Sequence, residues 1–184
     1  MVIYHVKTNF VLNMKCQKKI WFLWNYMPGK NGKITKIPFS AYGGATGTDD
    51  KYRDTWATYD EAYAAMQKCG ASGLGFKVPE GVYFLDIDHR ELSDPLLQKF
   101  LKRHNSYTEF SPSGNGIHIL GTCDAERLPI IYDAKKQRNI LSSEFYQKNS
   151  AIGVELYIGS ATNRFATFTG NMVNDAPLAE GTDA

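Results

Sequence analysis

The sequence contains little cysteine and no long apolar segment. Its cysteines, Cys16, Cys69 and Cys123, are widely spaced and form no Cys-x-x-Cys pair, which argues against a disulfide framework or a zinc site. No run approaches the roughly 18 apolar residues of a membrane helix, and Lys15 and Lys18 interrupt the layout of a signal peptide. We therefore expect a soluble, intracellular protein with no membrane partner.

Charge is unevenly distributed along the chain. The net charge is +2, but residues 1–50 contain seven lysines against two aspartates, whereas residues 151–184 contain one arginine against four acidic residues. A lysine-rich surface suits an anionic partner such as nucleic acid, although it is also typical of an ordinary solvated face. The length of 184 residues and the 43% hydrophobic content predict one domain with one sizeable core.

Strand patterns dominate the chain and indicate an α+β fold with a mostly antiparallel sheet. The predicted strands are Ile20–Tyr26, Ile34–Phe39, Gly73–Val78, Val82–Ile87, Tyr107–Ser111, Gly116–Thr122, Val154–Ile158 and Phe165–Thr169. A capping box, Thr58-x-x-Glu61, starts one helix that Gly70 ends, and Asp94-Pro95 starts a second helix. Residues 123–151 are interpreted as an insertion, and residues 176–184 as a tail or linker.

The segment Phe84-Leu85-Asp86-Ile87-Asp88 places two carboxylates two residues apart in a predicted strand. Side chains alternate along a strand, so Asp86 and Asp88 project from one face while Leu85 and Ile87 enter the core. Two carboxylates this close repel each other unless a hard divalent cation lies between them. The pattern therefore favours metal-assisted phosphoryl transfer, although acids at a strand end are also often simply solvated.

A Gly-rich turn precedes a histidine in Ser111-Pro112-Ser113-Gly114-Asn115-Gly116-Ile117-His118. Backbone N–H groups in such a turn can face an anion, and His118 can donate a hydrogen bond to a phosphate oxygen. The alternative, given equal weight, is a tight hairpin in which the histidine is hydrogen-bonded within the protein and binds no ligand. The motif is compatible with a phosphate site but does not require one.

A third motif, Gly153-Val154-Glu155-Leu156-Tyr157, is followed by a strand that begins near Arg164. Glu155 can complete a triad of carboxylates, and Arg164 can fork onto phosphate oxygens. Thr167 lies on one face of the following strand, where it can reach a sugar or a phosphate. An ordinary salt bridge and ordinary strand threonines are the alternative interpretation.

The succession of these three motifs resembles the archaeo-eukaryotic primase superfamily, specifically the primase-polymerases of phages, plasmids and other mobile elements. The resemblance covers about residues 20–170 and includes Lys36-Ile37-Pro38-Phe39-Ser40 near the N-terminus. It implies a single catalytic domain over residues 1–175, in which an N-terminal α/β module (1–72) packs on an RRM-like catalytic sheet with flanking helices (73–172). Many members have Ser two residues before the histidine and Asp as the third acid, where this chain has Gly116 and Glu155.

The resemblance implies a DNA primase or DNA-directed polymerase that joins nucleoside triphosphates on a single-stranded DNA template and primer. Asp86, Asp88 and Glu155 are then the catalytic residues and the ligands of two Mg²⁺ or Mn²⁺ ions. The implied nucleotide-binding residues are Ser111, Ser113, Gly114, Gly116, His118, Arg164 and Thr167. The basic residues expected to contact nucleic acid are Lys30, Lys33, Lys36, Lys135, Lys136 and Arg138. A helicase domain after the C-terminus and a cytoplasmic location in a bacterial or phage-infected cell are further expectations.

Other functions fit parts of the pattern. A primase-like module of a replication initiator would bind nucleic acid or nucleotides without catalysis. A haloacid-dehalogenase-type phosphatase or a glycosyltransferase also uses Asp-x-Asp, but the phosphatase needs a parallel sheet and a following Gly-Thr turn. A rolling-circle nickase needs two histidines around one apolar residue, and only His118 stands in that strand.

Overall fold

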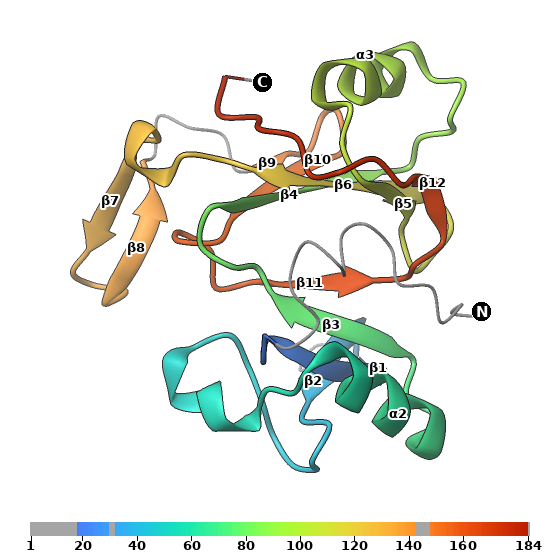
Figure 1. Ribbon diagram of the computed structural model, residues 1–184, viewed down its shortest axis with the longest axis vertical. Helices are drawn as coiled ribbons and strands as arrows, with labels where there is room; N and C mark the ends of the chain where they lie inside the picture. The colour runs from blue at the N-terminus through green and yellow to red at the C-terminus, as the bar shows by residue number, and fades with distance from the viewer. Residues whose placement is uncertain (1–17, 30–31, 143–147, 184) are drawn as a thin grey trace.

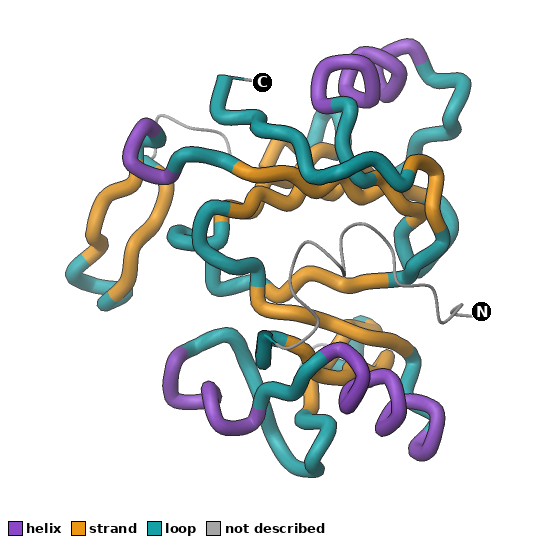
Figure 2. Tube along the Cα trace, viewed as in Figure 1, coloured by secondary structure: helices purple, strands orange, loops and turns teal. Residues whose placement is uncertain are grey.

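The computed structural model describes residues 18–29, 32–142 and 148–183, and it is built in layers. Two stacked sheets form the middle of the molecule, with helix α3 outside one sheet and helix α2 outside the other (Figure 1). Figure 2 shows that strands dominate and that helices lie only at the periphery. No helix among the described residues is long and apolar enough to span a bilayer.

The first sheet has the strand order β11-β3-β1-β2, and all neighbouring strands are antiparallel. Its strands are β1 (Trp21–Pro28), β2 (Ile34–Phe39), β3 (Gly73–Lys77) and β11 (Phe165–Phe168). The sheet thus combines two strands from the predicted N-terminal module with two from the predicted catalytic part. The boundary between these parts, placed near residue 73, stays a prediction.

The second sheet has the order β12-β5-β6-β4-β10-β9, again antiparallel throughout. Its strands are β4 (Val82–Asp88), β5 (Thr108–Phe110), β6 (Gly116–Thr122), β9 (Lys148–Asn149), β10 (Val154–Ile158) and β12 (Met172–Asn174). The predicted α+β class with mostly antiparallel strands is confirmed. The RRM-like arrangement stays a prediction.

Both predicted helices begin where their capping residues indicate, and the first also ends at the predicted Gly70. Helix α2 (Tyr59–Cys69) starts with a complete capping box between Thr58 and Glu61, and Gly70 ends it in the left-handed conformation at φ 68°. Helix α3 (Pro95–His104) starts at Asp94, whose side chain accepts hydrogen bonds from two backbone N–H groups of the first turn. Two short 3-10 helices, η1 (Asp50–Thr55) and η2 (Ala125–Arg127), lie in connecting segments.

The predicted insertion contains a third, two-stranded sheet, made of β7 (Ile130–Asp133) and β8 (Arg138–Leu141). This hairpin projects from one edge of the molecule (Figure 1), and buried Leu141 anchors it to the core. The predicted tail also contacts the body, because the Gly181 N–H donates to the Thr122 carbonyl and Arg127 pairs with Asp183.

The two faces of the second sheet differ in character, and this difference positions the site. Leu85, Ile87, Ile117 and Ile119 point toward α3 and pack around Leu97 in one hydrophobic cluster. Burying each of these side chains contributes about 2 kcal/mol, which fixes the register of β4. Residues of β4 with the opposite parity therefore have to face the first sheet.

Candidate functional site

Asp86 and Asp88 lie on the face of β4 that looks toward the first sheet. Their register partners in the antiparallel ladder bring two further predicted residues to the same face: Asp86 lies opposite His118 on β6 and opposite Glu155 on β10. Because directly opposed residues share a face, three residues from three strands converge here. The alternation predicted for Leu85 and Ile87 is confirmed, since both side chains are buried in the α3 cluster.

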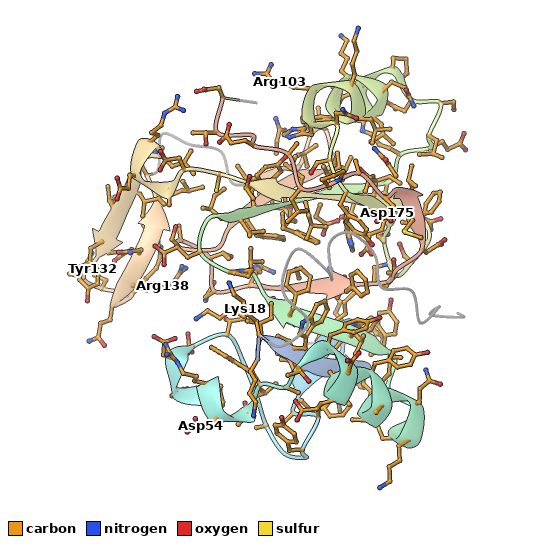
Figure 3. The ribbon with its side chains drawn as sticks, viewed as in Figure 1. Lys18, Asp54, Arg103, Tyr132, Arg138 and Asp175 are labelled. Carbon is orange, nitrogen blue, oxygen red and sulfur yellow. The ribbon has the colours of Figure 1, made fainter. Side chains whose placement is uncertain are left out.

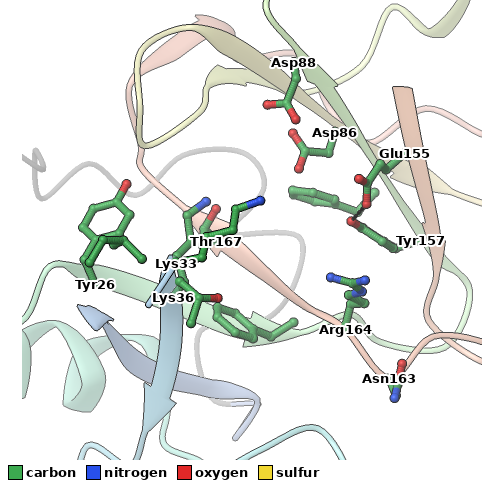
Figure 4. A pocket seen from close by; sticks show the side chains of 14 residues that line it. Tyr26, Lys33, Lys36, Asp86, Asp88, Glu155, Tyr157, Asn163, Arg164 and Thr167 are labelled. Carbon is green, nitrogen blue, oxygen red and sulfur yellow. Dashed lines mark hydrogen bonds between the residues drawn. The ribbon is translucent and has the colours of Figure 1, made fainter. Parts of the chain in front are cut away.

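A cavity of about 530 Å³ opens beside these carboxylates. Figure 4 shows Asp86, Asp88 and Glu155 on one side of it and Tyr26 and Lys36, from the first sheet, on another, with Lys33 from the loop before β2. The lining side chains are Tyr26, Lys33, Ile34, Thr35, Lys36, Phe84, Asp86, Asp88, Glu155, Tyr157, Asn163, Arg164, Phe165 and Thr167. A cavity of this size accommodates a nucleotide-sized ligand.

One oxygen of Asp86 faces His118 but makes no hydrogen bond to the described residues. Its Oδ1 atom is buried and accepts no hydrogen bond, although the side chain as a whole is 25% exposed. Burial raises the pKa of Asp86, and the neighbouring Asp88 raises it further, while His118 and Lys36 oppose the rise. A buried carboxylate oxygen without a hydrogen bond costs free energy, and either a charged His118 or a bound cation would offset that cost.

His118 is held between two carboxylates. Its Nδ1 lies 3.0 Å from Oε1 of Glu109, and its Nε2 lies 3.7 Å from Oδ1 of Asp86. A carboxylate only accepts, so Nδ1 carries a hydrogen and donates it to Glu109. His118 is 1% exposed and does not line the cavity. Its predicted contact with a triphosphate stays a prediction, whereas its place behind Asp86 is plain in the structure.

Glu109 was missed by the sequence analysis. It is fully buried and receives hydrogen bonds from the Tyr107 hydroxyl at 2.9 Å, the Gly170 N–H at 2.9 Å and the Thr169 N–H at 3.1 Å, besides the one from His118. The available signal was an acidic residue inside a predicted strand next to the strand of His118. Through these hydrogen bonds, the carboxylate of Glu109 links β5 to β6 and to the residues that follow β11.

Glu155 is already engaged by neighbouring side chains. Lys148 and the Tyr157 hydroxyl both donate hydrogen bonds to it. Burial alone would raise the pKa of Glu155, but the Lys148 and Tyr157 hydrogen bonds outweigh burial and hold that pKa below its usual range. The tyrosine ring stacks on Phe84, with ring centroids 5.9 Å apart.

The donor set at Asp86 and Asp88 fits a divalent cation. Within residues 18–29, 32–142 and 148–183 no three His, Cys, Asp or Glu side chains form a ready metal cluster. Mg²⁺ needs fewer protein ligands than that, because one or two carboxylates commonly hold it together with water and substrate phosphates. Asp86 and Asp88 are two such carboxylates on the cavity wall, and their role as metal ligands stays a prediction. Glu155 as a third ligand stays a prediction.

The basic residues divide into two groups. Lys33, Lys36 and Arg164 line the cavity, where burial lowers the pKa of the Lys36 ammonium while Asp86 and Asp88 oppose that shift. Arg138 lines an adjoining cavity of about 210 Å³ that also contains Arg164 and Glu155.

The other predicted basic residues, apart from Lys30, belong to the β7–β8 hairpin, which also contains Arg138. Figure 3 shows Arg138 on the β7–β8 hairpin at the edge of the molecule, and Lys135 and Lys136 lie in the turn of that hairpin. Lys136 pairs with Asp133 at 3.2 Å. Lys30 lies outside the described residues. Contacts of this group with nucleic acid stay predictions.

The Gly-rich turn contributes no side chain to the cavity. Ser111 and Ser113 bond to each other through their hydroxyls at 3.1 Å, and Gly114 adopts a φ of 76°. Gly116 lies directly opposite Asp88 on the neighbouring strand, so the turn borders the acidic pair without facing into the cavity. Phosphate binding by this turn stays a prediction.

Gly116 leaves no room for a side chain such as that of serine. A Cβ atom at this position would lie 2.7 Å from the Ile87 carbonyl oxygen and 3.3 Å from the Asp88 Cα. Both atoms belong to the backbone of β4 and cannot rotate away. The local packing of this chain therefore excludes a side chain at position 116.

Gly116→Ser is accordingly expected to lower the free energy of unfolding by about 1–3 kcal/mol, because the added atoms push on the backbone of β4. Urea denaturation of the purified domain measures this difference. Gly114→Asn is the matched control: its position has open space, and Asn tolerates a positive φ, so a loss below about 1 kcal/mol is expected. Equal stability of Gly116→Ser and the unaltered chain would refute this account of the strand contact.

Comparisons with known proteins agree with part of this interpretation. No protein-family model matches the chain. The chain is 35% identical over 109 residues to a protein named DNA Primase-polymerase from Nitratiruptor phage NrS-1. The matched segment covers 54% of this chain but 14% of that relative. Over about half its length, the chain is therefore related to a phage primase-polymerase.

Proposed function

We propose that this chain is the catalytic part of a template-dependent nucleotidyltransferase, a DNA primase or DNA polymerase. The observation that carries the proposal is the pair of carboxylates, Asp86 and Asp88, on the wall of a cavity that also presents Lys36 and Arg164, together with the Asp86 oxygen that accepts no hydrogen bond from the described residues. Two neighbouring carboxylates that can bind a metal ion, together with basic side chains on the same cavity, suit a triphosphate that carries a divalent cation. The similarity to a DNA Primase-polymerase points the same way.

In the proposed reaction the 3′-hydroxyl of a primer or first nucleotide attacks the α-phosphate of a nucleoside triphosphate. A new P–O bond forms while the bond to pyrophosphate breaks, and the hydroxyl proton leaves to solvent. Mg²⁺ or Mn²⁺ ions held at Asp86 and Asp88, with Glu155 as the third ligand, would lower the pKa of the attacking hydroxyl and offset charge on pyrophosphate. Membership of the archaeo-eukaryotic primase superfamily, with an RRM-like catalytic sheet, belongs to this proposal.

The chain's own residues have separate roles in this scheme. Glu109 fixes the ring of His118, and His118 in turn positions Asp86. Arg164 binds phosphate oxygens of the nucleotide from the cavity wall, with Thr167 on the neighbouring strand face. Ser113 and the backbone of the Gly-rich turn, which borders the acidic pair, are proposed to contact the triphosphate.

Nucleic acid is the proposed macromolecular partner. Lys33 and Lys36, at the cavity, contact primer or template phosphates, and the hairpin cations Lys135, Lys136 and Arg138 extend this contact outward. The chain accounts for a small part of the length of the relative it matches, so a helicase domain beyond Ala184 and a cytoplasmic place in a phage-infected cell are proposals about a longer protein.

Primer extension on a single-stranded template tests the function. The assay uses deoxy- and ribonucleotides in turn, with Mg²⁺ or Mn²⁺, and compares the unaltered chain with Asp86→Ala/Asp88→Ala. Metal-dependent extension that disappears in the double variant is expected. Retained DNA or nucleotide binding with no extension under any condition would favour the non-catalytic binding module instead.

A further inference from the structure

Tyr26 presents an exposed aromatic ring to the same cavity, on the wall formed by the first sheet. Its side chain is 48% exposed, and Ile34, which also lines the cavity, is 59% exposed. The two residues lie on neighbouring strands, with Tyr26 directly opposite Lys36. Exposed large apolar side chains at the mouth of a charged cavity are informative, because solvation alone does not favour them there.

The Tyr26 ring is held in place from one side. The ring of Trp24 meets it nearly perpendicularly, with centroids 4.9 Å apart and an interplanar angle of 84°. Trp24 is itself fixed, because its indole N–H donates to the Leu74 carbonyl at 2.9 Å and its ring fills the space over Gly73. An edge-to-face contact covers at most one face of the Tyr26 ring, so the other face is free of Trp24.

The other tyrosine that lines the cavity, Tyr157, already contacts neighbouring side chains through its hydroxyl and its ring. Tyr157 donates its hydroxyl hydrogen bond to Glu155 and stacks its ring on Phe84. By contrast, the Tyr26 hydroxyl makes no hydrogen bond to any residue that the structure describes. Among the residues that the structure describes, Tyr26 thus lines the cavity with a hydroxyl that makes no hydrogen bond and a ring that Trp24 contacts on at most one face.

The groups around Tyr26 match the parts of a nucleotide. Lys33 and Lys36 stand beside it, and Asp86 and Asp88 lie across the cavity (Figure 4). The lysine side chains suit phosphate groups directly, and the two aspartates suit them through a divalent cation. The exposed ring of Tyr26 then remains for a flat, apolar group. A nucleobase is such a group, and stacking of a base on an aromatic side chain is worth about 1–3 kcal/mol.

We propose that Tyr26 is a stacking platform for a nucleobase, which rests on the proposed nucleotidyl-transfer function of the cavity. The base belongs either to the DNA strand or to the free nucleoside triphosphate. Both present the same flat π-face, and a comparison of ligands with and without bases separates them.

The experiment measures binding by the unaltered chain, Tyr26→Ala, Tyr26→Phe and Tyr42→Ala. Tyr42 is the matched control, because it is 53% exposed in the same part of the chain but does not line the cavity. One arm compares a labelled single-stranded oligonucleotide with an abasic strand of equal length by fluorescence anisotropy. The other arm compares a nucleoside triphosphate with inorganic tripolyphosphate by calorimetry.

Tyr26→Ala is expected to weaken binding of a base-containing ligand about tenfold while leaving its baseless counterpart unchanged. Tyr26→Phe should restore binding, and Tyr42→Ala should behave as the unaltered chain. Loss in the oligonucleotide arm identifies a strand base, and loss in the triphosphate arm identifies the incoming nucleotide. Equal effects on base-containing and baseless ligands, or no effect in either arm, would overturn the proposal.

Failure of this inference is distinguishable from failure of the proposed function. If primer extension depends on Asp86 and Asp88 but Tyr26→Ala shows no base-selective loss of binding, the stacking role of Tyr26 is refuted and the proposed nucleotidyl-transfer function is kept. If Tyr26→Ala shows a base-selective loss of binding but the unaltered chain extends no primer, the stacking role of Tyr26 is kept and the proposed catalysis is refuted.

Discussion

Asp86→Asn is expected to lower the rate of nucleotide addition by about 10³-fold or more while the protein stays at least as stable. The rate falls because the amide cannot hold a divalent cation as a carboxylate does, and such a cation contributes several kcal/mol to the transition state. Stability is maintained because the substitution removes a carboxylate whose Oδ1 is buried without a hydrogen bond and whose pKa burial has raised. Single-nucleotide addition and thermal unfolding, measured on the same preparation, report the two quantities.

The matched control for this prediction is Glu91→Gln, which removes one charge from an exposed carboxyl outside the cavity. This variant should retain the activity and the melting temperature of the unaltered chain. A large drop in the melting temperature of Asp86→Asn would show that Asp86 is a structural group. Nearly normal activity in Asp86→Asn would exclude Asp86 from catalysis.

Glu109→Gln is expected to produce the largest loss of stability, about 3–5 kcal/mol, which for a domain of this size lowers the melting temperature by about 10 °C. The carboxylate accepts hydrogen bonds from two backbone N–H groups, a tyrosine hydroxyl and the His118 ring. An isosteric amide presents an NH₂ group to some of these donors, which leaves them unsatisfied in a fully buried place. Thermal and urea unfolding measure the loss.

A double-mutant cycle separates the link to His118 from the other hydrogen bonds. Glu109→Gln and His118→Asn should be strongly non-additive, because each substitution breaks the same hydrogen bond. The exposed Glu80→Gln serves as the control, with an expected change within about 0.5 kcal/mol. A melting temperature of Glu109→Gln within about 2 °C of the unaltered chain would contradict the buried network.

Local patterns predicted the parts of the molecule that depend on nearby residues. The two-residue alternation around Asp86 and Asp88 placed both acids on one face of β4, and the capping residues Thr58 and Asp94 marked the starts of both helices. These features follow from backbone geometry over a few residues. They needed no knowledge of which strands pair.

Features that depend on distant pairing were not predictable in the same way. Glu109 acquires its role only because β5 pairs with β6 and the end of β11 supplies the Thr169 and Gly170 N–H groups. Tyr26 reaches the cavity only because the first sheet stacks on the second. No local pattern encodes either contact, since both join segments that are far apart in sequence.

The engagement of Glu155 shows the same limit at the level of side chains. Its place opposite Asp86 follows from the strand register, but its hydrogen bonds to Lys148 and Tyr157 depend on which neighbours the fold supplies. The sequence could indicate a carboxylate on this face. It could not indicate that a lysine from β9 already binds it.

The claim on which the account depends is that Asp86 and Asp88 hold a divalent cation. Titration of the protein with Mn²⁺, followed by the electron paramagnetic resonance signal of free Mn²⁺, tests it without requiring any activity. We expect the unaltered chain to remove free Mn²⁺ from solution. We expect Asp86→Asn/Asp88→Asn, once thermal unfolding shows that it is folded, to leave the free Mn²⁺ signal unchanged. Equal Mn²⁺ binding by both proteins would contradict the account.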